Sequence, residues 1–189
     1  MNWTVALPEL VLACAAMAIL MVGVFRKDDA GFTATMLTLG ALLVGGVLVL
    51  GAPSGTGFNG LWINDAFSSF NKILILAAAA LALIVSMDFN ARQGIGRFEY
   101  PVLLLLSVVG MMMMISANDL MTLYLGFELM SLTLYVVAAF DRDSVRSSEA
   151  GLKYFVLGAL ASGLLLYGMS LIYGFAGTTG FAAVARALG

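Results

Sequence analysis

The sequence predicts an all-α, polytopic transmembrane helical bundle of about six helices. The chain has 189 residues, of which 62% are hydrophobic and only 11% are charged. A water-soluble domain cannot cover that much apolar surface, whereas a membrane protein leaves it in contact with lipid. The apolar residues are gathered in long runs with few charges, and the short alternating segments of a β-barrel are missing from the sequence.

Six apolar runs are long enough to cross the hydrocarbon layer, which takes about 20 helical residues. The first opens with Pro8 and the fourth with Pro101, and proline is tolerated in the first turn of a helix. The predicted spans are residues 4–25, 31–51, 65–88, 99–116, 119–139 and 146–174. A Gly-rich loop at 51–64 separates the second and third spans, and we expect Trp62 to lie at the membrane interface.

The positive charges of the loops predict the orientation of the chain. Arginine or lysine residues occur after the first, third and fifth spans, and none occurs after the second or fourth. They are Arg26, Lys27, Arg92, Arg97, Arg142 and Arg146. Loops rich in these residues stay in the cytoplasm. We therefore expect the N-terminus to lie outside.

Two ionisable residues lie inside the last two predicted spans. Glu128 is near the middle of the fifth span and Lys153 is within the sixth. A charge at the centre of a membrane helix costs about 2.5–3.5 kcal/mol, so such residues are rare and usually functional. Glu128 is about 14 Å past Asp119 and Lys153 about 10 Å past Arg146, which places the two depths about 5 Å apart. An acid and a base at similar depth indicate proton or ion handling.

Other polar residues have simpler explanations. Glu149 precedes Lys153 by four residues, the favourable order for a helical ion pair. We also name it as a third candidate residue for proton handling, beside Glu128 and Lys153. Lys72 is expected to extend its head to the interface, and Glu9 suits the positive end of the first helix. Either Asn118 or Asp119 can cap the fifth helix.

The sequence has no histidine, one cysteine and no glycine-rich phosphate loop. We therefore expect no metal or cofactor to be bound by this chain, and its small net charge gives no indication of nucleic-acid binding. The expected surroundings are a lipid bilayer and neighbouring membrane subunits.

The segments GFELMSL and SEAGLKYFVLGALASGLLLYG, at 126–132 and 148–168, closely resemble subunit N of bacterial respiratory complex I, the NADH–quinone oxidoreductase. The resemblance implies that Glu128 is the acid of a proton channel and that Lys153 is its partner. It also implies a bacterial inner-membrane location, other complex I membrane subunits as partners, and NADH and a quinone used elsewhere in the complex. This chain would then be a subunit of a proton-translocating enzyme that does no redox chemistry itself.

The resemblance also predicts how the chain is divided. Residues 1–97 correspond to three leading helices, residues 98–176 to the start of the first antiporter-like repeat, and residues 177–189 to the truncated beginning of the next segment. We therefore expect an N-terminal fragment of a longer protein. Two other functions remain open: a subunit of a multisubunit Na⁺/H⁺ antiporter, and a non-catalytic membrane scaffold.

Overall fold

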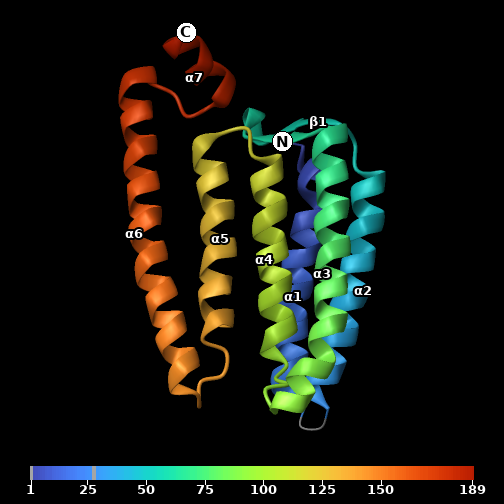
Figure 1. Ribbon diagram of the computed structural model, residues 1–189. Helices are drawn as coiled ribbons and strands as arrows, with labels where there is room; N and C mark the ends of the chain where they lie inside the picture. The colour runs from blue at the N-terminus through green and yellow to red at the C-terminus, as the bar shows by residue number, and fades with distance from the viewer. Residues whose placement is uncertain (1, 27–28) are drawn as a thin grey trace.

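The computed structural model describes residues 2–26 and 29–189. Within these residues, six helices are long and apolar enough to span a membrane, and they lie side by side (Figure 1). They are α1 (Leu7–Phe25), α2 (Ala30–Gly51), α3 (Ala66–Gln93), α4 (Glu99–Ser116), α5 (Leu120–Ala138) and α6 (Val145–Ala176). The predicted fold class is confirmed, and the ends of the helices fall within a few residues of the predicted ones. Lys27, which contributed to the orientation argument, lies outside the described residues, and the outward N-terminus stays a prediction.

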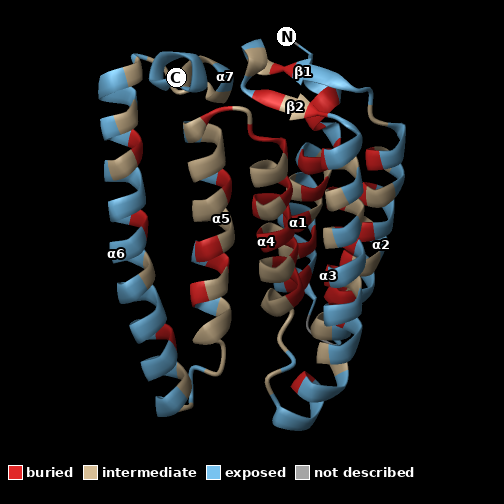
Figure 2. Ribbon diagram, turned by 45° about the horizontal axis from the view of Figure 1, so that its top comes forward, coloured by how far each residue is buried: buried red, intermediate tan, exposed pale blue. Residues whose placement is uncertain are grey.

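The core of the bundle lies among α1, α2, α3 and α4. Its centre consists of side chains that are almost fully buried, including Leu12, Leu105, Val108 and Met112. Helix α5 packs most extensively on α4, and α6 packs on α5 at the edge of the bundle. Figure 2 shows that α6 is exposed along most of its length, with a few buried positions toward α5.

Glycines allow α4 and α5 to approach closely. A Cβ atom at Gly110 would lie 2.6 Å from the backbone nitrogen of Met130, and one at Gly126 would lie 2.9 Å from the backbone nitrogen of Met114. Backbone atoms cannot move aside as a flexible side chain can. The close approach of α4 and α5 therefore depends on the absence of side chains at these two positions.

The predicted loop at 51–64 folds into a small cap over one end of the bundle. Strand β1 (Gly55–Gly57) pairs antiparallel with β2 (Trp62–Asn64), and the one-turn 3-10 helix η2 (Phe58–Gly60) lies between them. The 3-10 helix η1 (Trp3–Ala6) leads into α1 beneath this hairpin. Trp62 is only 7% exposed and packs with Val5 and Ala6, so protein encloses its indole ring. Its expected position at the membrane interface stays a prediction.

The turn between α4 and α5 joins the hairpin to the C-terminal segment. Asp119, not Asn118, caps α5, because its Oδ1 accepts hydrogen bonds from the backbone N–H groups of Met121 and Thr122. Asn118 instead donates through Nδ2 to the Gly60 carbonyl. Helix α7 (Phe181–Leu188) follows α6, and the Leu120 N–H bonds the Thr179 carbonyl just before it.

Candidate functional site

Glu128 lies on α5 and faces α6. The hydroxyl of Ser162, on α6, donates a hydrogen bond to Glu128 Oε1. The same Ser162 oxygen lies 3.0 Å from the hydroxyl of Tyr124, one helical turn before Glu128 on α5. Three polar groups in the middle of two apolar helices thus form one connected network. A network of this kind can hold a carboxyl group in place and supply it with proton donors and acceptors.

Lys153 does not contact Glu128. Its Nζ lies 2.6 Å from Oε1 of Glu149, four residues earlier on α6, and the two side chains are 70% and 59% exposed. Glu149 therefore holds Lys153 in the described structure, and no ion pair among residues 2–26 and 29–189 joins Lys153 to Glu128.

The depth estimate from the sequence was too small. Glu128 contacts Ser162, which is nine residues beyond Lys153 on the same helix, a rise of about 13 Å. The difference arises because Gly151, two residues before Lys153, lies against Ala139 at the end of α5, so α6 begins more than one turn beyond that end. Counting from the loop alone could not include that offset.

Tyr135 lies between the two levels. Its ring makes edge-to-face contacts with Tyr154 and Phe155 of α6. Its hydroxyl lies so close to Gly158 that any Cβ at that position would overlap it. Since Gly158 is five residues after Lys153 and four before Ser162, the Tyr135 hydroxyl is a polar group placed between the lysine and the glutamate.

The sequence analysis did not predict the buried acid–base pair of Lys72 and Glu9. Lys72 does not extend to the interface: it is 1% exposed and forms an ion pair with Glu9, which is 4% exposed. Glu9 does lie in the first turn of α1, as expected, and α1 and α3 place it and Lys72 at the same depth. The sequence did contain an indication of this pair, because Glu9 and Lys72 each lie about one to two helical turns from the predicted outer face of the membrane.

The fold and the polar groups inside it define a polytopic α-helical membrane protein with ionisable side chains in its spans. Residues 117–188 match the family model described as NADH:quinone oxidoreductase/Mrp antiporter, TM. The chain is 58% identical over its full length to NADH-quinone oxidoreductase subunit N of Granulibacter bethesdensis, and 58% identical over 95% of its length to that of Paramagnetospirillum magneticum. Over the part that it covers, the chain is thus similar to the membrane subunits described by this family model and, among them, to subunit N.

Two solved structures have a similar fold. A chain of respiratory complex I from Thermus thermophilus with bound aureothin has a TM-score of 0.74 and 27% identity, over 96% of this chain and 42% of that one. A chain of an archaeal membrane-bound sulfane sulfur reductase, also with a TM-score of 0.74, is 23% identical over 97% of this chain and 39% of that one, and shows the shared fold. The present chain spans 40% and 37% of the length of the two subunit N relatives.

Proposed function

We propose that this chain is part of a proton-translocating membrane subunit of a bacterial NADH–quinone oxidoreductase, and that Glu128 is its proton-carrying acid. The observation that carries the proposal is the network of Glu128, Ser162 and Tyr124 between two membrane-spanning helices. A carboxyl group there exchanges protons only through such neighbours or through water, because lipid offers none.

Lys153 and Glu149 form the second part of the proposed path. Their ion pair lies nearer the loop between α5 and α6, about 13 Å along α6 from the contact of Ser162 with Glu128. Tyr135 lies between the two groups, beside Gly158. Protons would pass from the lysine toward Glu128 by way of the tyrosine hydroxyl and water. A direct Glu128–Lys153 pair would require one of the two side chains to leave the partner it has in this structure.

The energies involved are of the size that such a role requires. Two charges about 4 Å apart attract by roughly 4 kcal/mol at an effective dielectric constant of about 20. Moving one charge across a potential of about 150 mV costs roughly 3.5 kcal/mol. Breaking or forming a single buried ion pair, such as a direct pair of Glu128 and Lys153, would therefore change a proton's free energy by about as much as the membrane potential does.

The remaining parts of the proposal come from the relatives. By analogy with subunit N, NADH and a quinone act in other parts of the complex, other complex I membrane subunits surround this one, and the location is a bacterial inner membrane. Residues 1–97 are proposed as leading helices and 98–176 as the start of an antiporter-like repeat. The exposed outer side of α6 is consistent with further protein packing beside it (Figure 2).

The test is proton pumping by the full-length subunit in its assembled oxidoreductase. Membrane vesicles carrying Glu128→Gln should oxidise NADH yet acidify their lumen several-fold less than unmodified vesicles. Asp88→Asn is the matched control, since it removes an acid that is 87% exposed. Normal acidification by Glu128→Gln, at unchanged assembly, would contradict the role of Glu128.

A further inference from the structure

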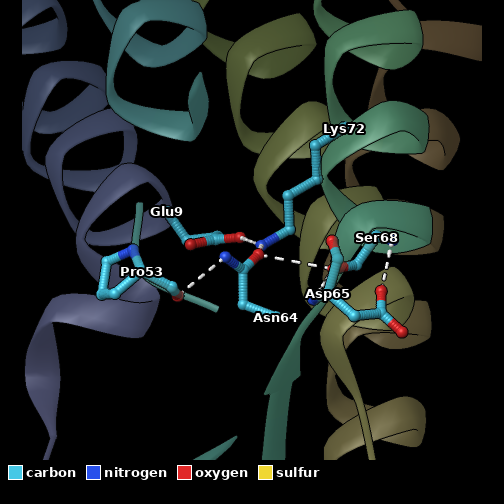
Figure 3. Close-up of polar contacts among 6 residues, drawn as sticks. All are labelled: Glu9, Pro53, Asn64, Asp65, Ser68 and Lys72. Carbon is cyan, nitrogen blue, oxygen red and sulfur yellow. Dashed lines mark hydrogen bonds and ion pairs between the residues drawn. The ribbon is translucent and has the colours of Figure 1, made fainter. Parts of the chain in front are cut away.

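The ion pair of Glu9 and Lys72 lies at the end of the bundle that the hairpin covers, well away from Glu128. Lys72 Nζ is 2.6 Å from Glu9 Oε1, and both side chains are almost completely buried (Figure 3). Removing two charges from water costs several kcal/mol per ion, so a pair of this kind is weak evidence for stability alone. The groups around the ion pair therefore indicate which role it has besides stabilising the fold.

Lys72 has partners in several directions. Besides Glu9, its ammonium group donates to Asn64 Oδ1 at 3.4 Å and lies 5.8 Å from the centre of the Trp62 ring. Asn64 is itself held in place, because its Nδ2 donates to the Pro53 carbonyl at 3.1 Å (Figure 3). A carboxylate, an amide oxygen and an aromatic face together satisfy a lysine ammonium. The hairpin thus provides a fixed site for the positive charge.

Glu9 is only half satisfied. Its Oε1 faces Lys72, while Oε2 is buried and has no hydrogen-bond partner in the described part of the chain. A buried carboxylate oxygen without a partner costs more than a lost hydrogen bond, and such atoms call for a water or another ligand. The pair is therefore asymmetric: its acid, and not its base, has an open position.

A cavity of about 290 Å³ lies beside Glu9, between the hairpin and the helices. Trp62 and Thr122 line it together with apolar residues, and the indole Nε1 of Trp62 is also buried without a partner. A buried water needs two to four polar partners and about 10–15 Å³ of such space, which is far less than this cavity offers. Leu61, which lines the cavity on the side of the hairpin, is 44% exposed, so the cavity lies next to the exposed surface at this end of the bundle.

We propose that Glu9 and this cavity form a second proton-binding site, at the predicted outer end of the bundle. Water in the cavity delivers a proton to Oε2, where an O–H bond forms, and the hydronium that supplied the proton becomes water. Lys72 keeps its three protons and its bond to Asn64. The site would exchange protons with the outer aqueous phase, independently of Glu128.

Few other charges act on this site. Helix α2 carries no ionisable side chain, and Asp88, Arg92 and Glu99 lie at the opposite ends of α3 and α4. Asp65 and Asp119 lie at the same end as the pair, but each is occupied in capping a helix. Protonation of Glu9 would therefore depend mainly on Lys72 and on the water in the cavity.

Infrared difference spectroscopy of the chain in liposomes, recorded between acid and alkaline pH, tests the proposal. The C=O stretch of one protonated carboxyl group should appear, shift in D₂O, and vanish in Glu9→Gln/Lys72→Met, which removes both charges together. Trp62→Phe replaces the indole with a phenyl ring, which has no N–H, and should move the same band. Asp88→Asn should change only the signal of an exposed carboxyl group.

Recording the spectra in a Glu128→Gln background separates this site from the proposed function, because the Glu9 band should persist there. Identical spectra for the unmodified and doubly substituted chains would show that Glu9 stays ionised and merely joins two helices. If the double variant does not fold, a lipophilic carbodiimide, which attacks protonated carboxyls, provides a second measurement on the unmodified chain. Labelling of Glu9 at neutral pH, without labelling of Asp65, supports the proposal, and an unlabelled Glu9 contradicts it.

Discussion

Lys153 pairs with Glu149 on the same helix, with 2.6 Å between Nζ and Oε1, whereas Glu128 accepts a hydrogen bond from the hydroxyl of Ser162. The acid and the base singled out in the sequence thus have separate partners. A proton that moves between them must cross roughly two and a half turns of α6. The Tyr135 hydroxyl, packed against Gly158, is the polar group between them.

The Glu149–Lys153 pair should matter more for function than for stability. Exposed ion pairs contribute about 0–1 kcal/mol, so Glu149→Gln should change the free energy of unfolding very little. In the assembled oxidoreductase the same substitution should reduce proton pumping several-fold if Lys153 lies on the path. Thermal unfolding and vesicle acidification, measured side by side, separate the two effects. Pumping that stays normal would remove Lys153 and Glu149 from the proposed path.

The Glu9–Lys72 pair should show strong coupling in a double-mutant cycle. Glu9→Gln or Lys72→Met alone leaves one buried group unmatched and should destabilise the fold by about 3–5 kcal/mol. The combined substitution should cost much less than the sum of the two, because no charge is left unpaired. The free energy of unfolding in detergent measures this. Additive losses would mean that the two side chains do not interact as the structure shows.

Glycine substitutions should distinguish the α4–α5 contact from the outer side of α6. An alanine in a helix is better than glycine by about 1 kcal/mol, so Gly163→Ala, which meets no atom within 4 Å, should stabilise the chain. Gly110→Ala gains the same propensity, yet its Cβ would lie 2.6 Å from a backbone nitrogen of α5. Overpacking costs about 1–3 kcal/mol, so this variant should be less stable than the unmodified chain. Equal stabilisation by both would refute the close contact.

Asp119 should make the stability of α5 depend on pH. Burial raises the pKa of Asp119, but hydrogen bonds from the Thr179 side chain and from the Thr122 and Met121 N–H groups more than offset it, and the pKa lies below its usual value. A lowered pKa stabilises the fold above the unfolded value of about 3.9, and this contribution is lost as the pH falls through the folded value.

Asp119→Ala should therefore cost about 0.5–2 kcal/mol at neutral pH, the value of an N-cap, and progressively less in acid. Unfolding of the two chains at a series of pH values measures the difference between them. Asp88→Asn, at an exposed acid within α3, is the control and should show no such trend. A difference that stays constant with pH would mean that the ionised carboxylate is not what caps the helix.

The helices were predictable because long apolar runs have few alternatives, and the structure places them within a few residues of the expected ends. The contacts between polar side chains of different helices were not predictable in the same way. Lys72 was assigned an interfacial position because its helix was considered alone, whereas α1 places Glu9 opposite it. The hairpin that covers both residues was not foreseen, since strands of three residues have too short a pattern to detect. Ser162, the partner of Glu128, was not singled out, because one serine in a long apolar helix forms no pattern that a sequence can show.

The central claim, that Glu128 carries protons, is most directly tested by the number of protons moved per NADH oxidised. It should be measured in the assembled oxidoreductase for Glu128→Gln and Glu128→Asp at matched rates of electron flow. We predict that the ratio falls in Glu128→Gln, which cannot ionise, and is largely restored in Glu128→Asp. An unchanged ratio in Glu128→Gln would contradict the account.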